Sequence, residues 1–231
     1  MTKAGIIGGL GPASTIDYYH DIVENYRKKY GDDSYPELII YSVDMHEIVS
    51  LIENQKYEEL ANIIIKKVSM LGKAGADFVA IASNSPHIAW KYIDGKTDIP
   101  VVSIIEATCN CIKEQNFKKV LIFATEFTMK NGLYSEALEK HQIDYILPED
   151  RDISILGNII YPNLENAIVI AEDKQCMIDI AEKYISKYSC DALLLGCTEI
   201  PLMIKPGDVS VPVIDTTKIH VEKICRLIEK A

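Results

Sequence analysis

The sequence predicts an α/β protein made of two similar parallel-sheet lobes that are related by a pseudo-twofold axis. Short apolar strands alternate with amphipathic helices, a pattern typical of parallel sheets with right-handed crossovers. Segments of the first half also return in the second half, in the same order and at nearly the same spacing. These observations predict a first α/β lobe of residues 1–100 with 209–231, and a second of residues 101–208.

The first half of the chain shows the alternation most clearly. Apolar residues at Leu60, Ile64, Val68 and Leu71 recur at helical spacing. Pro12 suits the first turn of a helix, as does the pair Ser85-Pro86. We expect strands at 4–7, 37–43, 77–82 and 101–104, and helices at 13–29, 45–53 and 57–73.

The repeat places two small reactive side chains at equivalent positions. Segment 77–87 returns as 191–201, segment 3–10 as 118–125, and segment 99–104 as 211–216. Ser83 and Cys197 each end a buried strand in this alignment, where ligands of α/β proteins bind. A pseudo-twofold axis would bring these two strand ends to face each other, so the active site is expected in the cleft between the lobes.

Composition excludes several function classes. The chain of 231 residues is 48% hydrophobic and 25% charged, as in ordinary globular proteins. A formal net charge of −10 disfavours nucleic acid and anionic membrane surfaces as partners. No apolar run reaches the length of a membrane span, and the N-terminus is typical of a strand and turn, so we expect a cytoplasmic protein.

The cysteines show no metal-binding pattern. There is no C-x-x-C, and Cys109 and Cys111 point to different faces of an expected helix, so no metal is predicted. In a cytoplasmic protein the thiols are expected to be reduced and, apart from Cys197, to pack as small hydrophobes. The six cysteines are Cys109, Cys111, Cys176, Cys190, Cys197 and Cys225.

Two acid/base side chains on opposite walls of a cleft suit the removal of a proton from one face of a carbon and its return to the other. A thiolate is a good base for this reaction, and a helix beginning after Cys197 is expected to lower the pKa of its thiol. Backbone N–H groups after Ser83 and Cys197 would bind a carboxylate. The pair therefore predicts racemisation or epimerisation of an α-carboxylate substrate.

Four motifs connect the chain to a known family. They are Gly8-Gly9-Leu10-Gly11-Pro12 with Thr15, Ser83-Asn84-Ser85-Pro86-His87, Ala124-Thr125 with Thr128, and Gly196-Cys197-Thr198-Glu199. Over nearly its whole length the sequence resembles the aspartate/glutamate racemase family, and its Glu199 resembles the aspartate-racemase branch. The resemblance implies a homodimeric isomerase that racemises an amino acid by two-base proton transfer, without pyridoxal phosphate or another cofactor. It implies catalytic roles for Cys197 and Ser83, and substrate binding by Leu10, Gly11, Asn84, Ser85, Thr125, Thr128, Thr198 and Glu199.

The sequence departs from the family pattern in three places. Ser83 stands where the family has its first catalytic cysteine, and an unassisted hydroxyl is a far weaker base than a thiolate. Glu126-Phe127 replaces small residues in the turn after Ala124. Aspartate-selective members have an Arg and a Lys for the substrate side chain. Here no Lys or Arg occurs between Lys29 and Lys56 or between Arg151 and Lys174, which leaves an acidic side chain without those partners.

Other functions remain open at this stage. A one-cysteine decarboxylase or isomerase of the same superfamily fits Cys197 alone, and a non-catalytic amino-acid-binding homologue would keep only the cleft. The sequence is equally consistent with a natural Ser83 and with an engineered replacement of cysteine. Dinucleotide binding is disfavoured because Ser14 stands where the fingerprint has its third Gly, and the chain lacks a P-loop. His87 is expected to cap or pack.

Overall fold

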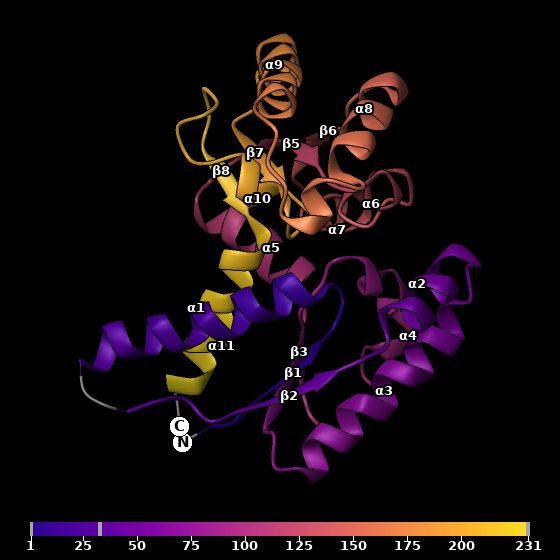
Figure 1. Ribbon diagram of the computed structural model, residues 1–231, viewed down its shortest axis with the longest axis vertical. Helices are drawn as coiled ribbons and strands as arrows, with labels where there is room; N and C mark the ends of the chain where they lie inside the picture. The colour runs from indigo at the N-terminus through magenta and orange to yellow at the C-terminus, as the bar shows by residue number, and fades with distance from the viewer. Residues whose placement is uncertain (1, 32–33, 230–231) are drawn as a thin grey trace. The chain divides into compact units, whose positions relative to one another are not determined.

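A computed structural model describes residues 2–31 and 34–229. The chain divides into two compact units: unit 1 is Met1–Ala107 with Thr217–Ala231, and unit 2 is Thr108–Thr216. Each unit contains one four-stranded parallel sheet, ordered β2-β1-β3-β4 in unit 1 and β6-β5-β7-β8 in unit 2 (Figure 1). The two orders are equivalent, so the α/β class and the prediction of two similar lobes are confirmed.

The strands are short and parallel, as expected for buried βα units. They are β1 Ala4–Gly8, β2 Leu38–Ser42, β3 Phe78–Ile81, β4 Val101–Val102, β5 Lys119–Phe123, β6 Asp144–Ile146, β7 Ala192–Leu195 and β8 Val213–Asp215. The α-helices are α1 Pro12–Tyr30, α2 Met45–Glu53, α3 Tyr57–Lys73, α4 Trp90–Ile93, α5 Ile104–Glu114, α6 Glu126–Lys130, α7 Ser135–Lys140, α8 Asp150–Ile160, α9 Ala171–Tyr188, α10 Ile200–Met203 and α11 Thr216–Glu229. Two 3-10 helices, η1 Ser85–Ala89 and η2 Leu164–Asn166, complete the described elements.

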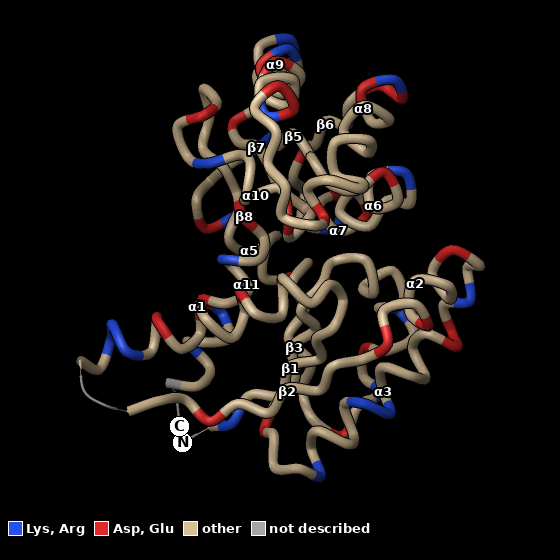
Figure 2. Tube along the Cα trace, viewed as in Figure 1, with Lys and Arg blue, Asp and Glu red and all other residues tan. Residues whose placement is uncertain are grey.

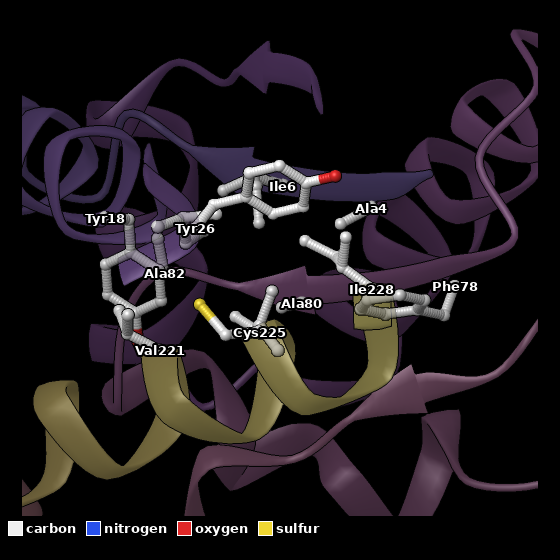
Figure 3. Close-up of a cluster of buried hydrophobic side chains, with 12 residues drawn as sticks. Ala4, Ile6, Tyr18, Tyr26, Phe78, Ala80, Ala82, Val221, Cys225 and Ile228 are labelled. Atoms are coloured by element: carbon white, nitrogen blue, oxygen red, sulfur yellow. The ribbon is translucent and has the colours of Figure 1, made fainter. Parts of the chain in front are cut away.

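Unit 1 packs helices on both faces of its sheet. On one face, α1 and α11 cover β1 and β3 through a cluster that includes Tyr18, Tyr26 and Cys225 (Figure 3). On the other face lies α3: a Cβ at Gly5 of β1 would be 3.2 Å from Leu71 Cδ1. Successive residues of a strand point to opposite faces, which explains why β1 is buried along its whole length.

Unit 2 is organised around the adjacent strands β5 and β7. They pair in parallel from Val120↔Ala192 to Phe123↔Leu195, and helix α9 packs against both. Figure 2 shows charged residues mainly on helices and connecting segments, whereas β1, β3 and β7 contain none. Burying an unpaired charge is costly, which explains why these fully buried strands contain no charged residue.

Most expected elements are present, and two differ from expectation. The helices predicted at 45–53 and 57–73 are confirmed as α2 and α3. The fourth strand was predicted as 101–104, but it has only two residues and Ile104 already begins α5. Ser85 begins a 3-10 helix before the four-residue α4. Across residues 2–31 and 34–229, no helix is long and apolar enough to cross a membrane.

Candidate active site

The glycine-rich turn after β1 is held in place by its own threonine and by the neighbouring strands. Gly9 has φ +86°, and a Cβ there would lie 2.6 Å from Val43 O, so only glycine fits. The Gly9 N–H donates to Thr15 Oγ1 at 2.8 Å. Ser14 Oγ donates to Ala82 O at 3.2 Å, which ties the first turn of α1 to the residue before Ser83. The turn carrying Leu10 and Gly11 therefore lies beside the end of β3.

Ser83, Asn84 and Ser85 form the turn that leaves β3. Ser83 is half-buried, with its backbone N–H donating to Ile81 O at 2.8 Å. Asn84 is buried, and its carbonyl oxygen accepts from the backbone N–H of His87 at 3.0 Å and from its Nδ1 at 3.2 Å. These bonds fix the direction of the turn. Within unit 1, the sequence-predicted residues Leu10, Gly11 and 83–85 follow the carboxyl ends of the paired strands β1 and β3.

His87 belongs to the interior of unit 1. Its side chain is 2% exposed and stacks on Trp90 with ring centroids 5.6 Å apart. Burial lowers the pKa of His87 to about 4, so the ring is neutral. The expectation that His87 packs is confirmed.

In unit 2, Cys197 follows β7 after a glycine that close packing requires. A Cβ at Gly196 would lie 2.9 Å from Cε2 of buried Tyr134 and 3.2 Å from Ala124 Cβ. The Gly196 N–H donates to Phe123 O at 2.7 Å, which joins the turn after β7 to the turn after β5. Cys197 itself is 5% exposed.

The thiol of Cys197 is bonded to a carboxylate. Cys197 Sγ donates to Glu199 Oε2 at 3.0 Å, and Thr198 Oγ1 donates to Glu199 Oε1 at 2.8 Å. Burial first, and then the negative charge of Glu199, raise the pKa of the Cys197 thiol well above its usual value. Hydrogen bonds from the backbone N–H groups of Glu199 and Ile200 oppose this rise but do not reverse it.

The expectation of a lowered thiol pKa was therefore wrong. It rested on a helix beginning after Cys197, but α10 has only four residues and its N-cap is Glu199. A helix this short contributes little dipole, whereas a carboxylate in direct contact favours the protonated thiol. In this geometry Cys197 is an acid that already has a proton acceptor beside it.

Thr125 and Thr128 hold the turn after β5. Thr125 caps α6, since its Oγ1 accepts from the Thr128 N–H at 3.2 Å, and Thr125 Oγ1 also donates to Thr128 Oγ1 at 3.0 Å. The turn continues into Glu126, which forms an exposed ion pair with Lys130. Within unit 2, the sequence-predicted residues Thr125, Thr128 and 197–199 thus follow the carboxyl ends of two paired strands.

Sequence reasoning missed one carboxylate on the 3-10 helix that packs against α10. Glu165 lies in η2, which packs against α10, and its side chain is partly buried. Burial and the charge of Glu199 raise the pKa of Glu165. Among the described residues it has no hydrogen bond or ion pair. No local motif marks Glu165, and the lack of Lys and Arg between Arg151 and Lys174 was the one sequence signal nearby.

The described residues offer no obvious metal centre. No group of three or more His, Cys, Asp or Glu side chains within them is arranged to hold a metal ion. What the turns do present is a thiol, hydroxyls, backbone N–H groups and carboxylates. Side chains of these types can transfer protons and bind polar ligands.

Comparisons with known proteins agree on one family. The family model for Asp/Glu/Hydantoin racemases matches residues 7–224. The broad specificity amino-acid racemase RacX of Bacillus subtilis is 24% identical over 216 residues, covering 92% of each chain. An aspartate racemase homologue from Pyrococcus horikoshii is 36% identical, covers 100% of both chains and has a TM-score of 0.89. The aspartate racemase of Picrophilus torridus is 26% identical with a TM-score of 0.74, over 100% of this chain and 96% of that one.

Proposed function

Because the chain belongs to the Asp/Glu/Hydantoin racemase family, we propose that it is a cofactor-independent amino-acid racemase that uses Cys197 as its main acid/base and Ser83 as the opposing group. The observation that carries this proposal is the hydrogen bond from Cys197 Sγ to Glu199 Oε2, 3.0 Å long, at the carboxyl end of a central strand. A thiol bonded to a carboxylate has both a proton to give and a group that can take it.

In the proposed mechanism Cys197 works in both directions of proton transfer. As an acid, its thiol gives its proton to a Cα carbanion, and the thiolate remains. As a base, it first passes its proton to Glu199 along the existing bond, and the thiolate then removes the Cα proton. The carbanion takes a proton on its other face from water held by Ser83, and solvent restores that proton. This assignment makes Glu199 the proton acceptor for the thiol and Ser83 the weaker partner.

The proposal assigns substrate binding to the turns at the strand ends. Backbone N–H groups in the turns carrying Leu10, Gly11, Asn84 and Ser85 would hold the α-carboxylate. Hydroxyls of Thr125, Thr128 and Thr198 would orient the amino acid. The half-buried position of Ser83 and the strand-end location of these turns support this assignment.

The test is Cα proton exchange with deuterated solvent, followed by NMR for the L and D forms of a panel of amino acids. The enantiomer whose Cα–H faces Cys197 should exchange about 100-fold or more faster than the other, since one efficient general base contributes about 10²–10⁴-fold. Cys197→Ala should abolish exchange, and Ser83→Cys should bring the two rates together. Equal rates for both enantiomers in the unaltered protein, or exchange that survives Cys197→Ala, would count against the mechanism.

A one-cysteine decarboxylase is the second candidate, favoured by the protonated thiol of Cys197 and the hydroxyl at position 83. In that reaction a carbon–carbon bond breaks, carbon dioxide leaves, and the carbanion takes the Cys197 proton. Release of carbon dioxide from a malonate-type acid, lost in Cys197→Ala, with no Cα exchange of any amino acid, would select this function.

The quaternary structure and cellular location belong to the proposal as well. A homodimer is expected, and light scattering coupled to size exclusion would measure it. A cytoplasmic location is also expected, and cell fractionation would test it.

A further inference from the structure

We propose that the outer side of α1, together with the edge strand β2, is the surface through which two copies of this chain pair. The α1–β2 surface consists of Ile16, Tyr19, Val23 and Tyr30 of α1, Tyr35 in the segment that follows, and Ile40 of β2. All of it belongs to unit 1. Pairing through this surface does not depend on the reaction that the chain catalyses.

Helix α1 carries two rows of apolar side chains. The inner row is buried in the core of unit 1 and comprises Tyr18, Ile22 and Tyr26. The outer row is Ile16, Tyr19, Val23, Tyr26 and Tyr30. Its spacings alternate between three and four residues, as in the apolar seam along which two helices pair. The inner row is sufficient to dock α1 on its own sheet, so the outer row indicates a second partner.

The outer row lies on the side of α1 that faces β2. Thr15 Oγ1 accepts from the Gly9 N–H at 2.8 Å, and a Cβ at Gly9 would lie 2.6 Å from the carbonyl oxygen of Val43, the residue after β2. Tyr19 and Val23 follow Thr15 at successive intervals of four residues, so they lie on the same side of the helix. The outer row is therefore at the β2 edge of unit 1.

Strand β2 extends this apolar surface. Within the described residues β2 pairs only with β1, so its other side is a sheet edge. Leu38 packs against the buried cluster of α1, and Ile40, two residues further, points to the same face of the sheet. The strand reads Leu-Ile-Ile-Tyr-Ser and lacks the charges and prolines that usually protect an edge. The Arg27 guanidinium lies 5.7 Å from the ring centroid of Tyr35, which places Tyr35 beside α1.

The exposed apolar area is close to that of a stable dimer interface. Tyr19, Tyr30 and Tyr35 are 51%, 43% and 56% exposed, which leaves on the order of 300 Å² of tyrosine surface in water. Ile16 and Ile40 are 67% and 41% exposed and add about 100 Å². A standard interface buries about 800 Å² per partner, of which roughly 60% is apolar. These five side chains therefore supply most of the apolar area that a homodimer needs.

The charges of α1 favour a second copy in antiparallel orientation (Figure 2). The acidic residues precede the last turn and are Asp17, Asp21 and Glu24. The basic residues of the last turn are Arg27, Lys28 and Lys29. A twofold axis at Val23, the middle of the outer row, places the basic end of each helix beside the acidic part of the other. The outer row and β2 contain no charged residue, so two copies with a formal net charge of −10 each can meet there without close like charges.

The first test introduces a charge into the surface. Ile16→Glu should raise the Kd of the homodimer at least about 100-fold, because the twofold axis makes each substitution count twice. Met70→Glu is the matched control, since Met70 is 41% exposed on α3, away from this surface, and it should leave the Kd unchanged. Sedimentation velocity over a concentration series measures the Kd, and circular dichroism checks that both variants are folded.

The second test examines the symmetry. A residue on a twofold axis meets its own copy, so Val23→Cys should form a disulfide-linked dimer under mild oxidation. Met70→Cys and the unaltered protein should remain monomeric on a non-reducing gel. A lack of cross-linking at position 23 in a dimeric protein would overturn the twofold arrangement.

Two results of the sedimentation experiment would overturn the proposed surface. One is an unaltered protein that stays monomeric at micromolar concentration, because a different partner would then have to cover the surface. The other is an equal Kd for folded Ile16→Glu and Met70→Glu. Sedimentation does not involve Cα exchange, so a dimer without racemase activity would support this surface while rejecting the proposed reaction.

Discussion

Tyr18→Phe should destabilise unit 1 through one buried hydrogen bond. Tyr18 and His220 are both 0% exposed, and the Tyr18 hydroxyl donates to His220 Nδ1 at 2.7 Å. His220 Nε2 donates to Val102 O at 3.0 Å, so Nδ1 is the nitrogen without a proton. Removing the hydroxyl leaves that buried acceptor without its donor, at a cost of about 1–3 kcal/mol.

Denaturation by urea and by heat would measure this cost. For a chain of this size, 1–3 kcal/mol corresponds to a fall in Tm of roughly 2–12 °C. Tyr19→Phe is the matched control because Tyr19 is 51% exposed on the same helix, and it should change stability by less than about 0.5 kcal/mol. If Tyr18→Phe were as stable as the unaltered protein, or no less stable than Tyr19→Phe, the Tyr18–His220 bond would not stabilise the fold as reasoned.

Two further predictions concern titrating groups. Burial lowers the pKa of His87 to about 4 and that of His220 to about 3, against 6.5 in the unfolded chain. The unfolded chain therefore binds protons more readily than the folded state. The free energy of unfolding is highest above pH 6.5 and falls, as the pH decreases below 6.5, by about 1.4 kcal/mol per pH unit for each histidine. Urea midpoints between pH 7 and pH 5.5, above the carboxylate range, would measure this slope, and a flat profile would contradict it. Separately, Glu199→Gln should lower the pKa of the Cys197 thiol and speed alkylation of that thiol by iodoacetamide. The same change should slow Cα exchange by about 10²–10⁴-fold, because the thiol loses its proton acceptor. Slower alkylation together with unchanged exchange would refute the role given to Glu199.

The repeat in the sequence correctly predicted two similar α/β lobes. Strand ends, turn residues and helical spacing are local properties, so the first and last residues of α2 and α3 could be predicted from the sequence. The bounds of the fourth strand could not be predicted in this way, because β4 is defined by the pairing of Val101 and Val102 with β3 and not by its own apolar run. The motif residues lie where the repeat placed them, at the turns after β1, β3, β5 and β7.

The direction of the pKa shifts at the site could be derived only from the tertiary structure. A helix start after Cys197 was a reasonable reason to expect a lowered thiol pKa, but the direction depends on burial and on which way the Glu199 carboxylate turns. Neither is encoded in the spacing of Gly196 to Glu199. The same holds for Glu165, whose pKa is raised by burial first and then by the charge of Glu199.

By itself the sequence determined the α/β class, the two similar lobes, the family, and the strand ends that carry Ser83 and Cys197. Periodicity and strand-end motifs reveal these features, because each feature depends on residues that are close together in the sequence. Only the tertiary structure decided that burial keeps His220 neutral beside Tyr18, that Cys197 is bonded to Glu199, and that burial and the charge of Glu199 raise the pKa of Glu165. The physical reason is that desolvation and Coulomb energies depend on distances across the fold, which no local pattern records.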